Sequence, residues 1–84
     1  MQGRSPSGGR FDPPIRVRLD DGVGIVRTVA EAIDWIDNDD RLAVRLQLAM
    51  AALRRARETG SASDLALARS ALSVELARQH MLLD

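Results

Sequence analysis

The segment from Arg41 to Arg57 constrains the fold more than any other stretch, because it is the longest uninterrupted run of strong helix formers. It contains no Gly or Pro and one β-branched residue, Val44, so it loses little conformational freedom on entering a helix. Apolar residues recur along it at helical spacing: Leu42, Leu46, Ala49 and Leu53. We therefore predict one continuous helix at the centre of the fold.

Both ends of this segment carry helix-terminal signals. Asp39 or Asp40 can cap the start, where free N–H groups and the helix dipole favour a carboxylate. Gly60 offers a left-handed stop beyond the other end. Three cations lie near that end, where the dipole favours positive charge: Arg54, Arg55 and Arg57.

Size and composition favour association. The chain has 84 residues and no cysteine, so disulfides and thiolate–zinc sites cannot stabilise it. With one Phe, one Trp and no Tyr, its core must be aliphatic. A domain of this size is close to the limit of stability for a single hydrophobic core, and association would add buried area.

The first fourteen residues form a separate compositional region. They are rich in Gly, Ser and Pro and include one large apolar residue, Phe11, so they offer little surface for burial. We predict a disordered N-terminal tail over residues 1–14 and a single domain over residues 15–84.

A β-hairpin is expected at the start of the domain. Residues 15–19 alternate between apolar side chains and arginine, as in a half-buried strand. The turn residues Asp20-Asp21-Gly22 follow, and residues 23–27 resume a β pattern. A lone hairpin is barely stable in water, so its apolar face must pack on helices.

Two loop lengths are compatible with this hairpin, and they differ in the residues that face the helices. A three-residue loop pairs Val17 with Ile25 and keeps Ile25 on the buried face. A two-residue Asp21-Gly22 loop pairs Val17 with Val26 and turns Ile25 outward. We predict the first arrangement because it buries Ile25.

Two capping boxes mark further helices. Thr28 with Glu31, and Ser61 with Asp64, have the spacing at which side chains satisfy the free amides of a first turn. The helix after Thr28 has one apolar stripe, and the last helix has two neighbouring stripes. The predicted fold class is therefore α+β, with an N-terminal two-stranded β-hairpin packed on three α-helices (β-β-α-α-α).

No residue pattern commits the chain to catalysis or to metal binding. The acidic run around Asp37, Asp39 and Asp40 has no glycine and lacks EF-hand spacing, so helix termination and capping explain it better than Ca²⁺ binding. His80 has no partner at three or four residues' distance and suits a helix C-terminus. We predict a protein that is not an enzyme and has no cofactor and no metal.

The charge of the chain argues against some classes of binding partner. All twelve cations are arginine and the net charge is zero, which disfavours a general nucleic-acid binder. No apolar run is long enough to span a membrane, and the N-terminus lacks the apolar core of a signal peptide, so we expect a cytoplasmic protein. Binding of nucleic acid or an anionic ligand through Arg54, Arg55 and Arg57 stays the alternative hypothesis.

The leading hypothesis is a small interaction domain of unknown biological role that forms a homodimer. The apolar stripe of the central helix is wide enough to contact both neighbouring helices and a second subunit. Trp35 lies beside the stripe of the preceding helix, where it can cover a helix junction or contact a partner. The expected interface residues are Leu46, Met50, Leu53 and Trp35.

Several segments resemble family 982 of the domains of unknown function, small bacterial proteins frequent in rhizobia. They are the strand Ile15-Arg16-Val17-Arg18-Leu19, the turn Asp21-Gly22, and the segments Val29-Ala30-Glu31-Ala32-Ile33, Ala51-Ala52-Leu53 and Ala68-Arg69-Ser70-Ala71-Leu72. The chain departs from the family pattern at Asp39-Asp40, where Trp-Pro is expected, and at Leu72, where Phe is expected. The resemblance implies a small α+β fold and no activity, and it assigns no site residues.

Overall fold

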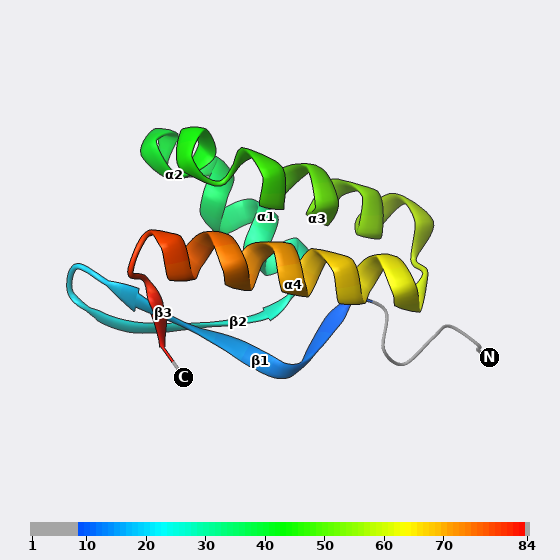
Figure 1. Ribbon diagram of the computed structural model, residues 1–84, viewed down its shortest axis with the longest axis horizontal. Helices are drawn as coiled ribbons and strands as arrows, with labels where there is room; N and C mark the ends of the chain where they lie inside the picture. The colour runs from blue at the N-terminus through cyan, green and yellow to red at the C-terminus, as the bar shows by residue number, and fades with distance from the viewer. Residues whose placement is uncertain (1–8, 84) are drawn as a thin grey trace.

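A computed structural model of the chain describes residues 9–83 (Figure 1). In chain order, the elements are β1 (Arg10–Leu19), β2 (Gly22–Thr28), α1 (Val29–Asp37), α2 (Asp40–Arg45), α3 (Gln47–Thr59), α4 (Ala62–Arg78) and β3 (Leu82–Leu83). The α+β class with an N-terminal hairpin is confirmed. The described residues hold four helices instead of three, and a short third strand joins the sheet in the order β2-β1-β3.

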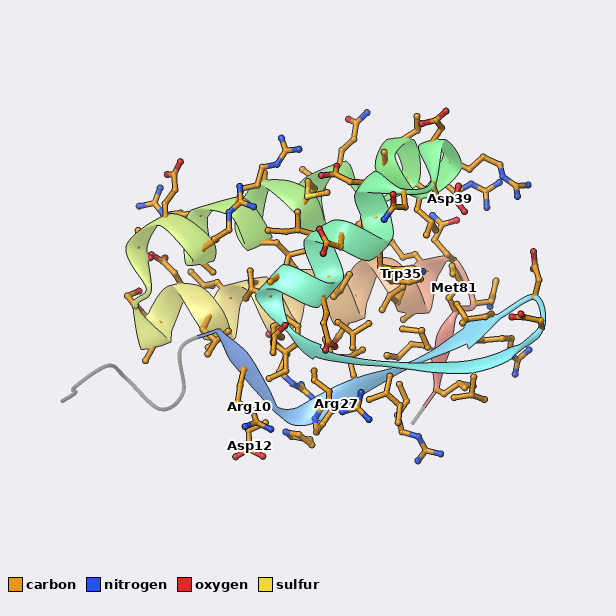
Figure 2. The ribbon with its side chains drawn as sticks, turned by 180° about the vertical axis from the view of Figure 1, so that it is seen from behind. Arg10, Asp12, Arg27, Trp35, Asp39 and Met81 are labelled. Carbon is orange, nitrogen blue, oxygen red and sulfur yellow. The ribbon has the colours of Figure 1, made fainter. Side chains whose placement is uncertain are left out.

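The helices all lie on one side of the sheet, where α1 and α4 contact the strands and α2 and α3 pack on other helices (Figure 1). The α4 helix packs on β1, and α1 packs on β2 and α3. Side chains from every helix enter the core, which includes Ile15 and Val17 from the sheet with Ile36, Leu53 and Leu72 from the helices. The opposite face of the sheet is open in the part of the chain that the structure describes (Figure 2).

The hairpin register differs from the predicted one. Asp20 and Asp21 form the turn, Val17 pairs with Gly24, and Ile25 lies on the outer face with 45% of its surface exposed. The prediction that Ile25 is buried was therefore wrong. A Cβ added at Gly24 would lie 3.0 Å from Leu19 Cδ1 and 3.2 Å from Val17 Cγ2. The side chains of Leu19 and Val17 thus occupy the space on the inner face at position 24, and glycine fits there because it has no Cβ.

The expected disordered tail is corrected for residues 10–14, which form the first half of β1. Arg10 pairs with Thr28, and the Val29 N–H donates to the Gly9 carbonyl oxygen at 2.7 Å. Phe11 is only 3% exposed, so the one large apolar side chain of this segment joins the core. That burial offsets the cost of ordering the segment. Residues 1–8 lie outside the described part of the chain.

The central helix was predicted to be continuous, but the structure interrupts it at Leu46. Leu46 has φ −112° and ψ 34°, and it separates α2 from α3. Its backbone groups stay paired: the Leu46 N–H donates to Leu42 O at 2.8 Å, and Leu46 O accepts from Met50 N at 2.8 Å. The change of direction lets Leu42 and Leu46 both be buried while α2 packs against α1 and α3 packs against α4.

The N-caps and the stop at Gly60 are confirmed, but the reciprocal half of each capping box differs from the prediction. Glu31 Oε1 accepts from the Arg27 N–H at 2.8 Å instead of the Thr28 N–H, and Asp64 Oδ2 accepts from the Thr59 hydroxyl at 2.6 Å instead of the Ser61 N–H. Thr28 Oγ1 accepts from the Glu31 N–H at 3.0 Å, and Ser61 Oγ accepts from the Asp64 N–H at 3.0 Å. Asp39 caps α2, and Gly60 ends α3 with a left-handed φ of 65°. The acidic run between α1 and α2 therefore terminates one helix and starts the next, as predicted.

Candidate functional site

Three of the predicted interface residues belong to the core. Leu46 and Leu53 are completely buried, and Met50 is nearly so. Leu46 and Leu53 have no surface with which to contact a second copy, so their assignment to a subunit interface is corrected. Met50 keeps 7% of its surface accessible in a shallow hollow, and the wide apolar stripe mainly serves the chain's own helices. Trp35 is half-buried against the core and keeps part of its indole accessible.

The arginines proposed to bind an anion face two different elements. Arg54 Nη2 lies 3.6 Å from Asp37 Oδ1 of α1, and Arg55 Nε lies 3.5 Å from Asp64 Oδ1 of α4. Arg57 has no ion-pair partner within residues 9–83. Two of the three guanidinium groups thus already have carboxylate partners, on either side of α3.

An apolar accessible surface lies where α3 and α4 run side by side. Leu48, Leu67 and Val74 are 71%, 63% and 53% exposed. They line a shallow hollow, and we call this surface the α3–α4 face. Its other residues are Ser70, Ala71, Glu75 and Arg78.

The periodicity of α4 explains why this face stays open. Ala68, Leu72 and Leu76 recur every four residues and are fully buried, so they fix the side of α4 that packs on the core. Leu67, Ser70, Ala71 and Val74 form a neighbouring stripe that points away from it. The second apolar stripe of the last helix was visible in the sequence, but the sequence did not show which stripe would be covered.

The charges around this face compensate one another. At the end near Arg78, the Arg78 Nη1 atom lies 4.0 Å from Glu75 Oε2. At the start of α4, the Thr59 hydroxyl donates to Asp64 Oδ2 at 2.6 Å. This bond is the main cause that lowers the pKa of Asp64. Burial opposes the shift, and Ser61 and Arg55 add to it. The surface therefore presents apolar side chains between locally paired charges.

The open face of the sheet has a different character. Arg16 and Arg18 point outward, as the alternation predicted, and Arg27 joins them from β2. Figure 2 shows Arg27 directed away from the helices. Val23 and Ile25 are exposed between these arginines. This face combines positive charge with apolar side chains, and it lacks the aromatic residues on which nucleic-acid bases stack.

Two classes of site find no support in the described residues. No group of three or more His, Cys, Asp or Glu side chains within residues 9–83 is placed to hold a metal ion. Over the same residues, no helix combines the length and the apolar character needed to cross a membrane.

Comparison of the chain with models of protein families, with curated proteins and with solved structures finds no match.

Proposed function

We propose that this chain is a small non-enzymatic interaction domain that self-associates as a homodimer through the α3–α4 face. The observation that carries the proposal is the clustering of Leu48, Leu67 and Val74, three large apolar side chains that are each more than half exposed. A contiguous apolar surface on a small domain marks an interaction site more often than scattered exposed residues do.

A second copy fits this face because the stripe on α4 is self-complementary. Two α4 helices packed antiparallel about a twofold axis between Ser70 and Ala71 bring Leu67 of each copy opposite Val74 of the other. The small side chains of Ser70 and Ala71 let the helices approach closely at the axis. Leu48 of α3 then widens the contact on both sides.

The electrostatics of the face are compatible with pairing of identical copies. Glu75 and Arg78 compensate each other at the rim, so no net charge accumulates where the two surfaces would meet. A standard interface buries roughly 800 Å² on each partner, a modest part of the 5555 Å² accessible surface. The domain could therefore dimerise and still keep the open sheet face accessible.

Sedimentation equilibrium of the full chain at micromolar concentrations tests the proposal. The wild type is expected to fit a dimer, and the Leu67→Glu variant is expected to fit a monomer with an unchanged circular dichroism spectrum. Val23→Glu places the same charge on an exposed apolar position of β2 and is the matched control. A monomeric wild type contradicts the proposal, and so does dissociation by Val23→Glu with no effect of Leu67→Glu.

The second hypothesis, binding of nucleic acid or an anionic ligand through Arg54, Arg55 and Arg57, is less well supported because two of these side chains face carboxylates. Binding through phosphates weakens steeply with salt. An Arg57→Gln variant that loses salt-sensitive binding of an oligonucleotide would favour it.

Membership of family 982 and a cytoplasmic location are also proposals. The first rests on the segments quoted above.

A further inference from the structure

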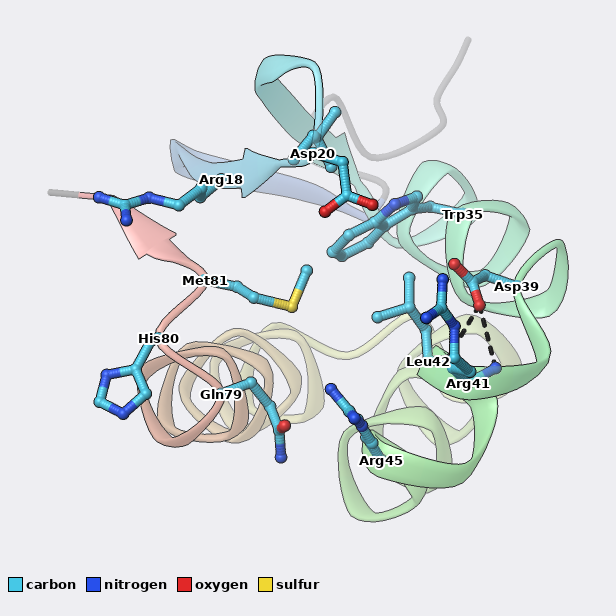
Figure 3. Close-up of a pocket in the computed structure, with 11 residues that line it drawn as sticks. Arg18, Asp20, Trp35, Asp39, Arg41, Leu42, Arg45, Gln79, His80 and Met81 are labelled. Atoms are coloured by element: carbon cyan, nitrogen blue, oxygen red, sulfur yellow. Dashed lines mark hydrogen bonds between the residues drawn. The ribbon is translucent and has the colours of Figure 1, made fainter.

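A cleft beyond the C-terminal end of α4 is lined in part by Trp35. It has a volume of about 360 Å³ and opens between the β1–β2 turn, the helices α1 and α2, and the chain that leaves α4 (Figure 3). Small-molecule sites in proteins begin at about 300 Å³. The cleft shares no residue with the α3–α4 face, so an inference about it stands apart from the proposed dimer.

One side of the cleft is apolar and is built from distant parts of the chain. Trp35 comes from α1, Leu42 from α2 and Met81 from the segment before β3. Figure 3 shows the Met81 thioether and the Trp35 indole turned toward the same space. Met81 is fixed there by two backbone bonds, to Leu76 O at 2.8 Å and from the Arg18 N–H at 2.6 Å. These side chains offer a surface for a planar or apolar group.

A second side of the cleft is cationic. Arg41 and Arg45 lie one turn apart on α2, a spacing that places their side chains on the same face of the helix. Neither forms an ion pair within residues 9–83. The nearby Asp39 uses Oδ1 to accept from the Arg41 and Leu42 N–H groups at 3.0 and 3.4 Å (Figure 3). It serves as the cap of α2, while both guanidinium groups keep donors for a carboxylate.

The third side is anionic. Asp20 belongs to the β1–β2 turn, and in Figure 3 its carboxylate is directed toward the indole of Trp35. It forms no ion pair within the described residues. Arg18 and His80 also border the cleft, but their side chains point away from its centre in Figure 3.

We infer that this cleft binds a small organic zwitterion with an apolar or aromatic body, the chemical class of the apolar α-amino acids. The carboxylate of the ligand pairs with Arg41 and Arg45, its ammonium group faces Asp20, and its body rests on Trp35 and Met81. A ligand with only a negative charge would place that charge near the Asp20 carboxylate and leave Asp20 without a partner. A ligand with only a positive charge would be repelled by Arg41 and Arg45. A zwitterion satisfies both charged sides.

Fluorescence of the single tryptophan tests this inference on the intact chain, since the protein has one Trp and no Tyr. The three probes are L-phenylalanine, 3-phenylpropanoate and phenethylamine, titrated at equal ionic strength. Phenylalanine is expected to give a saturable change in Trp35 emission. Each analogue lacks one charged group and should bind about ten-fold more weakly, the effect of losing one charge-assisted contact.

Two conservative variants assign the charged sides. Arg45 and Asp20 are exposed, so Arg45→Gln and Asp20→Asn should leave the fold intact. Arg45→Gln should weaken phenylalanine binding about ten-fold and leave phenethylamine binding unchanged. Asp20→Asn should weaken phenylalanine binding and leave 3-phenylpropanoate binding unchanged. The inference is overturned if none of the probes saturates, if all three bind equally, or if neither variant changes phenylalanine binding.

Discussion

The Arg18 N–H donates a hydrogen bond of 2.6 Å to the carbonyl oxygen of Met81, and it joins the first strand to the segment that follows the last helix. Leu82 then pairs with Val17 and Leu83 with Arg16, so β3 completes one side of the sheet. Because Val17 faces the core and Arg16 faces outward, the two leucines differ in role. Leu82 packs against the core, and Leu83 lies on the outer face.

This difference gives the first prediction. Leu82→Ala should lower the free energy of unfolding by about 1–2 kcal/mol, less than for a fully buried leucine because Leu82 is only half-buried. Leu83→Ala is the matched control and should lower the free energy of unfolding by less than Leu82→Ala does. Urea denaturation measures both. Equal losses for the two variants would show that β3 does not pack as described.

The hairpin register can be tested at two neighbouring positions. Val26 is buried, so Val26→Thr should lower the free energy of unfolding by about 1–3 kcal/mol through an unpaired hydroxyl. Ile25 lies on the outer face, and Ile25→Thr should change the free energy of unfolding by less than about 0.5 kcal/mol. Denaturant titrations of the two variants compare these values. A larger loss for Ile25→Thr would favour the register in which Ile25 faces the helices.

Phe11 tests the contribution of residues 10–14 to the domain. Its side chain is almost fully buried, so Phe11→Ala should cost about 3–5 kcal/mol, a large fraction of the stability of a small domain. Thermal unfolding followed by circular dichroism would show the loss as a lower melting temperature. An unchanged melting temperature would mean that this segment does not pack on the core in solution.

The Thr59–Asp64 bond predicts a pH dependence. Because the pKa of Asp64 is lowered in the folded state, the unfolded chain takes up the proton at higher pH than the folded chain does. The resulting stabilisation is present above the ordinary aspartate pKa of about 3.9 and is lost as the pH falls through the lower folded-state pKa.

Thr59→Val removes the main cause of this shift. The pKa of Asp64, followed by an NMR titration of its carboxyl carbon, should rise toward its ordinary value. The variant should be less stable than the wild type at neutral pH, and the difference should shrink in strong acid. An unchanged Asp64 pKa would show that the hydroxyl does not hold this carboxylate.

The features predicted correctly from sequence depend on neighbours within a few residues. The capping pairs Thr28–Glu31 and Ser61–Asp64 and the stop at Gly60 are interactions within one helical turn, so spacing alone reveals them. The outward position of Arg16 and Arg18 follows in the same way from the two-residue period of a strand.

The features that were missed depend on contacts between distant segments. Nothing in the residues around Leu46 breaks a helix, and the break reflects how α2 and α3 pack on different partners. The hairpin register places Gly24 opposite Val17, where the side chains of Leu19 and Val17 leave little room for a Cβ. The cleft joins Asp20, Trp35 and Met81, which no sequence spacing relates.

In the proposed dimer, two copies meet through the α3–α4 face. The most direct measurement is an isotope-filtered NOE spectrum of an equal mixture of isotope-labelled and unlabelled chains. The twofold arrangement predicts intermolecular NOEs between the Leu67 methyl groups of one copy and the Val74 methyl groups of the other. A monomeric sample at the same concentration, or intermolecular NOEs confined to Val23 and Ile25, would contradict it.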